Sequence, residues 1–180
     1  DVDYSFEGQN REQQKSTGSM KTVMPIILIL MFAIIILTFR SFKQTSFILI
    51  LIPFSLIGVG WGHFIEGLPI SLFSFLGLIA LIGILVNDAL VFVSAFNTNI
   101  KDGMTFQTAL HKAALSRFRP IVLTSVTTIA GLAPLMLETS LQAQFLIPMA
   151  ATIAYGLGVA TIMTLIVLPV LISLSNSVSV

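Results

Sequence analysis

The sequence contains no cysteine, which excludes disulfide bonds, thiol catalysis and cysteine metal sites. Charged residues make up only 9% of the 180 residues and nearly cancel to a formal net charge of +1, so no basic surface for nucleic acid is expected. Hydrophobic residues make up 56%, and the mean hydropathy of +0.99 lies well outside the range of soluble domains. The composition predicts an integral membrane protein.

Apolar blocks recur along the chain, each close to the roughly 20 residues that a helix needs to cross a bilayer core of about 30 Å. They predict an all-α polytopic bundle with transmembrane spans at about 22–39, 46–64, 70–97, 120–137 and 145–174. A further segment, at about 105–118, is amphipathic, and Thr105 can cap it at its start. We expect this segment to lie as a helix on the cytoplasmic membrane surface. Its apolar side is formed by Phe106, Ala109, Leu110, Ala113 and Ala114.

The first twenty residues are polar and contain two glycines, so they do not fit in hydrocarbon. The chain starts without an initiator Met or a basic region, and its first apolar block lies behind twenty polar residues, so no signal peptide is expected. We therefore interpret residues 1–20 as the end of a domain outside the membrane and residues 21–180 as a transmembrane domain, both cut from a longer protein.

Lysine and arginine in the short loops predict the orientation. They gather on one side of the membrane, whereas Glu66 and Glu138 mark the loops of the other side. Because basic loops stay in the cytoplasm, the basic side is predicted to be cytoplasmic, with the N-terminal end outside and the C-terminus inside. The basic loop residues are Arg40, Lys43, Lys101, Lys112, Arg117 and Arg119.

The glycines of the second span and the two histidines of the chain indicate helix packing rather than a binding site. Gly58 and Gly62, four residues apart, predict close packing against another helix, and the surrounding glycines lack the setting of a nucleotide-binding loop. His63 and His111 fall on opposite sides of the membrane without companion ligands. We therefore expect no metal site, no cofactor and no hydrolytic triad, and predict that the protein is not an enzyme.

Asp88 is the one acid among eight that falls inside a predicted span. A charge at that depth costs at least about 2.5 kcal/mol on insertion scales, so such an acid normally faces the bundle interior and serves a purpose. Desolvation disfavours the ionised carboxyl, which allows proton exchange near neutral pH where water reaches the group. Asp88 is the candidate proton site. The alternative is a structural carboxyl that is permanently neutral or hydrogen-bonded to a neighbouring helix.

Hydroxyl groups in the fourth span are candidate partners for Asp88. Thr124 and Thr128 share one helix face, and Thr128 matches the estimated depth of Asp88 more closely than Thr124 does. The alternative for either threonine is a hydrogen bond from the hydroxyl to a carbonyl of its own helix.

Two stretches stand out, Gly83-Ile-Leu-Val-Asn-Asp-Ala-Leu-Val91 and Arg117-Phe-Arg-Pro-Ile-Val-Leu-Thr-Ser125. Both resemble the resistance-nodulation-division efflux pumps of the acriflavine-resistance type. Gly131-Leu-Ala-Pro-Leu135 and Leu168-Pro-Val170 extend the resemblance over nearly the whole chain. It implies the C-terminal membrane domain of a proton-driven exporter of drugs or other amphiphiles in the bacterial inner membrane. The implied partners are membrane lipids, the missing N-terminal half and periplasmic domains, further copies in a homotrimer, a periplasmic adaptor and an outer-membrane channel.

The resemblance also implies roles for single residues. The threonine and the arginine of the family's proton relay fall on Thr124 and Arg117. The family's lysine position is occupied by Asn87, and Asp88 follows where those pumps often have asparagine. Asp88 is then either a second proton site or the coupling site of a different branch. We predict that its protonation switches its hydrogen bonding with Asn87 and with Thr124 or Thr128, and thereby the tilt of the helices.

Three other functions compete with efflux as interpretations of a five-span chain. A protein-export accessory subunit of related architecture would differ in its periplasmic domains, and a sterol-sensing or lipid-binding module would not depend on a proton gradient. An intramembrane aspartyl protease would need two membrane aspartates, whereas this sequence offers one.

Overall fold

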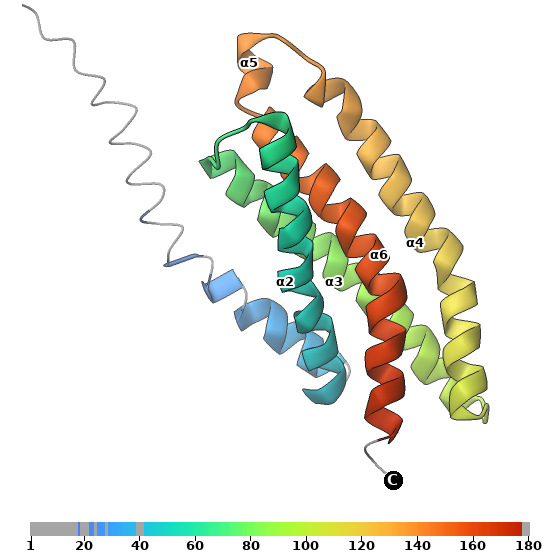
Figure 1. Cartoon of the computed structure of the whole chain (residues 1–180). Helices are drawn as coiled ribbons and strands as arrows, with labels where there is room; N and C mark the ends of the chain where they lie inside the picture. The colour runs from blue at the N-terminus through green and yellow to red at the C-terminus, as the bar shows by residue number, and fades with distance from the viewer. Residues whose placement is uncertain (1–17, 19–21, 24, 28, 39–41, 178–180) are drawn as a thin grey trace, which may run out of the picture. The chain divides into compact units, whose positions relative to one another are not determined.

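A computed structural model describes residues 18, 22–23, 25–27, 29–38 and 42–177, and the chain divides into two compact units, 1–41 and 42–180. The second unit contains α2 (Phe42–Glu66), α3 (Leu72–Lys101), α4 (Phe106–Met136), the short α5 (Leu141–Gln144) and α6 (Ile147–Ser177), as Figure 1 shows. The described residues form helices and loops only, which confirms the all-α prediction.

Four of these helices, α2, α3, α4 and α6, are long and apolar enough to cross a membrane. They correspond to the predicted second to fifth spans. The predicted first span, 22–39, lies partly outside the described residues, and its described residues are helical. The predicted lead-in, 1–20, lies outside them except for Gly18. The predicted number of five spans plus one surface helix is therefore not confirmed.

The predicted surface helix is not a separate element. A single helix, α4, runs from Phe106 through Pro120 to Met136, so the segments predicted at about 105–118 and 120–137 are continuous. Proline removes only one backbone hydrogen bond, and apolar helices tolerate that loss while their other backbone groups stay paired. With 31 residues, α4 is roughly 46 Å long and exceeds a bilayer core of about 30 Å.

The predicted cap of this helix is confirmed. The Thr105 side chain accepts a hydrogen bond from the backbone N–H of Thr108, at 3.5 Å. On the predicted apolar side, Ala109, Leu110 and Ala113 are buried. The segment is therefore helical with much of its predicted apolar side buried, whereas its place on the membrane surface stays a prediction.

Helix α6 is the common packing partner of this unit, because it contacts α2, α3 and α4. Figure 1 shows α6 between α2 and α4, with α3 crossing behind it. Its contact with α2 depends on glycine: a methyl group on Gly58 would come within 2.5 Å of the Tyr155 carbonyl oxygen, and one on Gly62 within 2.6 Å of the Tyr155 ring. The prediction of close packing at Gly58 and Gly62 is confirmed.

Polar contacts fix the two ends of α3. At its start, His63 of α2 lies 2.8 Å from the Ser74 hydroxyl through Nε2 and 3.1 Å from the Val59 carbonyl oxygen through Nδ1. Toward its end, Gln44 and Asn97 exchange two hydrogen bonds between their side-chain amides, at 2.9 and 3.1 Å. These contacts hold both ends of α3 against α2.

Candidate functional site

Asp88 lies in the interior of the helical unit. Its side chain is only 8% exposed, and Leu85, Ala89 and Phe92 beside it on α3 are also buried. Asp88 follows Leu81 by two helical turns and therefore lies on the same face of α3. Leu81 packs directly over Gly156 of α6. Asp88 is thus on the side of α3 that faces the bundle, and it forms no hydrogen bond or ion pair with any residue that the structure describes.

Asn87 has a different environment. It is exposed, as is Gly83 one turn earlier, and a methyl group on Gly83 would meet no atom within 4 Å. Neighbouring residues of a helix point about 100° apart, so Asn87 and Asp88 lie on different sides of α3. In the described part of the chain, the structure does not join these two side chains by a hydrogen bond.

The predicted hydroxyl partners are bonded within their own helix. Thr124 donates to the Pro120 carbonyl oxygen at 2.9 Å, and Thr128 donates to the Thr124 carbonyl oxygen at 2.8 Å. Thr124 is exposed and Thr128 is partly exposed. The structure therefore shows no hydrogen bond between Asp88 and either threonine among the described residues. Both hydroxyls instead bond to carbonyl oxygens of α4, which was the alternative.

Arg117 belongs to the buried stripe of α4. It follows Ala113 and precedes Ile121 by one turn each, and both of these residues are buried. Its Nε atom is buried and has no hydrogen-bond partner among the described residues. Arg117 thus faces inward but does not pair with Asp88, so the relay of Asp88, Asn87, Thr124, Thr128 and Arg117 remains a prediction.

A buried contact between hydroxyls of α4 and α6 was missed by the sequence analysis. Ser125 of α4 and Thr161 of α6 lie 2.5 Å apart through their hydroxyl oxygens. Thr161 is 9% exposed, Ser125 is 3% exposed, and Thr164 is 1% exposed. The signal was the spacing of Thr161 and Thr164 by three residues, which places both on one side of an otherwise apolar helix.

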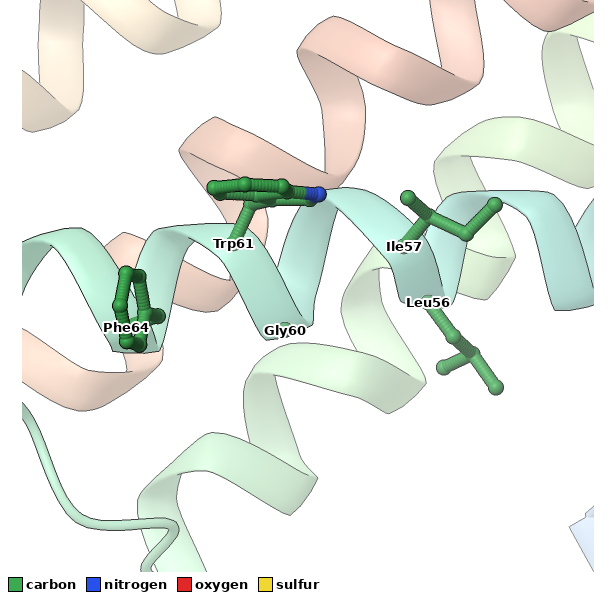
Figure 2. A pocket seen from close by; sticks show the side chains of 5 residues that line it. All are labelled: Leu56, Ile57, Gly60, Trp61 and Phe64. Carbon is green, nitrogen blue, oxygen red and sulfur yellow. The ribbon is translucent and has the colours of Figure 1, made fainter.

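An apolar depression lies on the surface of α2, and none of the polar residues discussed above lines it. Its volume is 390 Å³, and it is lined by Leu56, Ile57, Gly60, Trp61 and Phe64 (Figure 2). The Trp61 and Phe64 rings meet edge to face, with centroids 6.0 Å apart. None of the lining side chains titrates, so this surface cannot exchange a proton.

Comparison with known proteins places the chain in a family. It matches the AcrB/AcrD/AcrF family over residues 1–175. The cobalt-zinc-cadmium resistance protein CzcA of Cupriavidus metallidurans is 31% identical over 169 residues, which are 94% of this chain and 16% of CzcA. The nickel and cobalt resistance protein CnrA of the same organism is 31% identical over 164 residues, which are 91% of this chain and 15% of CnrA.

A crystal structure of a heavy metal efflux pump has the same fold over this region. The TM-score is 0.84 at 28% identity, with 94% of this chain and 17% of that chain covered. This chain therefore spans only a small part of the length of the relatives it matches. These relatives are named for metals, so the acriflavine-resistance type is not supported, whereas the broader resemblance is confirmed. The chain belongs to the AcrB/AcrD/AcrF family of resistance-nodulation-division efflux transporters.

Proposed function

We propose that this chain is the membrane part of a proton-driven efflux transporter in which Asp88 carries the coupling proton. The observation that supports this role is a buried acid in a membrane helix, 8% exposed, with no ion-pair partner among the described residues. A permanently ionised carboxylate in that position would be costly, whereas a carboxyl that alternates between its neutral and ionised forms can carry a proton.

Protonation of Asp88 would change the packing between α3 and its neighbours. The neutral carboxyl tolerates apolar neighbours such as Leu85 and Phe92, whereas the ionised form requires water or hydrogen-bond donors. A proton that enters from the periplasm and leaves to the cytoplasm would therefore bias the unit between two arrangements. Transmission to periplasmic domains of the longer protein would couple this change to export.

A divalent metal cation is the substrate class that the relatives favour, because CzcA, CnrA and the structurally similar pump are all named for metals. Among the described residues, no three His, Cys, Asp or Glu side chains could hold a metal ion together. The substrate would then bind in parts of the longer protein outside the described residues. An amphiphile is the other substrate class, and the export experiment separates the two.

The rest of the proposal concerns location and assembly. The transporter is an inner-membrane protein, with the N-terminal end of this chain periplasmic and its C-terminus cytoplasmic, as the distribution of Lys and Arg indicates. It acts as a homotrimer with a periplasmic adaptor and an outer-membrane channel, and its membrane part contacts lipid. Family membership supports this assembly.

The test is export by cells that contain the full-length transporter. Cobalt, zinc and cadmium are measured beside a fluorescent amphiphile, with and without a protonophore, for the wild type, Asp88→Asn and Asp102→Asn. Asp102 is a matched control because it is an exposed acid at the end of the same helix. We expect gradient-dependent export of at least one metal, lost in Asp88→Asn at equal membrane levels and retained in Asp102→Asn.

Each deviation has its own meaning. Undiminished export by Asp88→Asn would make the carboxyl structural and reject its coupling role. Export of the amphiphile and of no metal would show that the substrate is an amphiphile rather than a divalent metal cation. Export that ignores the protonophore would reject proton coupling.

A further inference from the structure

One exposed stripe of α4 is basic at its first end and apolar at its second. Lys112 and Arg119 lie seven residues apart and therefore on one face of the helix, and both are exposed. Leu123 and Val126 continue this face about one and two turns beyond Arg119, and they are 58% and 57% exposed. Figure 1 shows α4 at the edge of the unit, where it packs against α3 and α6. None of the residues that α4 buries belongs to these four, which we call the α4 stripe.

The length of α4 sets the depth of the stripe in a membrane. Counted back from Met136, a bilayer core of about 30 Å takes up roughly 20 residues, so the core begins roughly two residues before Arg119. Lys112 then lies in the headgroup region and Arg119 at its boundary. Leu123 and Val126 lie roughly 9–14 Å inside the core. The stripe therefore has the polarity profile of a phospholipid, with charge at headgroup depth and apolar side chains at acyl-chain depth.

The two cations of the stripe are not neutralised within the described part of the chain. Neither Lys112 nor Arg119 forms a hydrogen bond or an ion pair with a described residue, and α4 contains no Asp or Glu. The acid nearest to them along the chain is Asp102, ten residues before Lys112. The other long helices carry fewer cations at this end of the unit, Lys43 on α2, Lys101 on α3 and none on α6. The stripe therefore fits a negatively charged partner.

We propose that the α4 stripe binds an anionic phospholipid of the adjacent leaflet. Lys112 and Arg119 contact the headgroup phosphate, for which Arg offers two parallel donors and Lys a point charge. Seven residues correspond to roughly 10 Å along the helix, a gap that two long flexible side chains can close toward one headgroup. Leu123 and Val126 pack against an acyl chain of the same lipid.

A lipid fits this surface better than a further helix of the longer protein does. A helix would have to place acids level with Lys112 and Arg119, whereas an anionic lipid supplies negative charge at this depth by itself. The inference goes beyond the proposed function, because it needs α4 in a membrane but neither proton coupling nor a particular substrate.

The test is fluorescence quenching in the full-length transporter, without other cysteines, in nanodiscs of phosphatidylcholine. A bimane label on Leu123→Cys reports lipids at the stripe, and a label on Leu56→Cys, exposed on α2, is the control site. The quenchers are phosphatidylglycerol and phosphatidylcholine with the same spin-labelled acyl chain. At Leu123→Cys we expect phosphatidylglycerol to reach half-maximal quenching at an about 5- to 25-fold lower mole fraction, since each basic residue near the surface contributes about 5-fold. At Leu56→Cys the two lipids should quench equally.

Charge variants separate the stripe from general surface charge. Lys112→Gln combined with Arg119→Gln should abolish the preference for phosphatidylglycerol at Leu123→Cys. Lys43→Gln combined with Lys101→Gln removes the same charge from α2 and α3 and should keep the preference. Lys112→Arg should also keep it, because the charge is retained.

Several results would overturn the inference. Equal quenching of Leu123→Cys by the two lipids, without any charge variant, would do so even if the double variants failed to reach the membrane. A preference that survives Lys112→Gln with Arg119→Gln, or that both double variants lose equally, would also do so. A label on Leu123→Cys that neither lipid quenches would show that another part of the longer protein covers the stripe. Quenching needs no transport, so each of these results leaves the proposed function standing.

Discussion

The seam between α2 and α6 makes a quantitative prediction about glycine. In Gly58→Ala, the new methyl group would lie 2.5 Å from the Tyr155 carbonyl oxygen and 2.8 Å from Val159, so the helices must separate. Overpacking of this kind costs about 1–3 kcal/mol. In Gly60→Ala, on the same helix, the methyl group would meet nothing within 4 Å. Replacing glycine by alanine raises the helix propensity equally at both positions. The difference in stability between the two variants therefore measures the overpacking at Gly58.

A cysteine probe reads this difference locally. The chain has no cysteine, and Ala160, next to Val159, is 1% exposed, so Ala160→Cys reacts with a maleimide only when the packing around this part of α6 opens. In the full-length transporter without other cysteines, we expect labelling in Gly58→Ala to be about 5- to 150-fold faster than in Gly60→Ala. Equal labelling rates in the two variants would refute the argument that Gly58 is required for close approach.

Two further predictions concern polar contacts. The two hydrogen bonds between the Gln44 and Asn97 amides should give a coupling energy of about 0.6 kcal/mol, and not above about 1.7 kcal/mol. The measurement is a double-mutant cycle of Gln44→Ala and Asn97→Ala with unfolding as the readout. A coupling energy of zero would show that the pair does not stabilise the protein. Thr105→Ala should lower the free energy of unfolding by about 0.5 kcal/mol, at the low end for a helix cap, because the hydrogen bond from Thr108 is 3.5 Å long. It should also speed proteolysis at the loop between α3 and α4. A loss of about 2 kcal/mol would contradict this interpretation.

Much of the fold follows from local signals in the sequence. The apolar runs located α2, α3 and α6 because roughly twenty apolar residues have few other stable environments. Thr105 was identified as a cap, and Gly58 and Gly62 as a packing face, because capping and close approach depend on residue type and spacing alone. The division into separate segments at about 105–118 and 120–137 was wrong, since α4 keeps its other backbone bonds without the N–H that Pro120 lacks.

The environment of Asp88 could be predicted only in part. Its burial followed from the cost of a charge in a membrane helix. Its neighbours depend on how far α3 and α6 are shifted along each other, and Gly77 and Gly156 set this shift through contacts between distant parts of the chain. Depth estimates favoured the threonines of α4, whereas the structure bonds the hydroxyls of Thr124 and Thr128 to carbonyl oxygens of α4 itself.

The central place of α6 has a consequence for biosynthesis. A ribosome completes α2, α3 and α4 before α6, yet each of these three helices packs against α6. Between Glu66, where α2 ends, and Ile147, where α6 begins, there are about 80 residues, which take roughly 4–16 s to translate. During that interval, Gly58 and Gly62 expose the backbone of α2 to lipid or to the insertion machinery. The contacts of α2, α3 and α4 with α6 therefore form only after α6 has entered the membrane, whereas α3 can already pack against α2 and α4 before that.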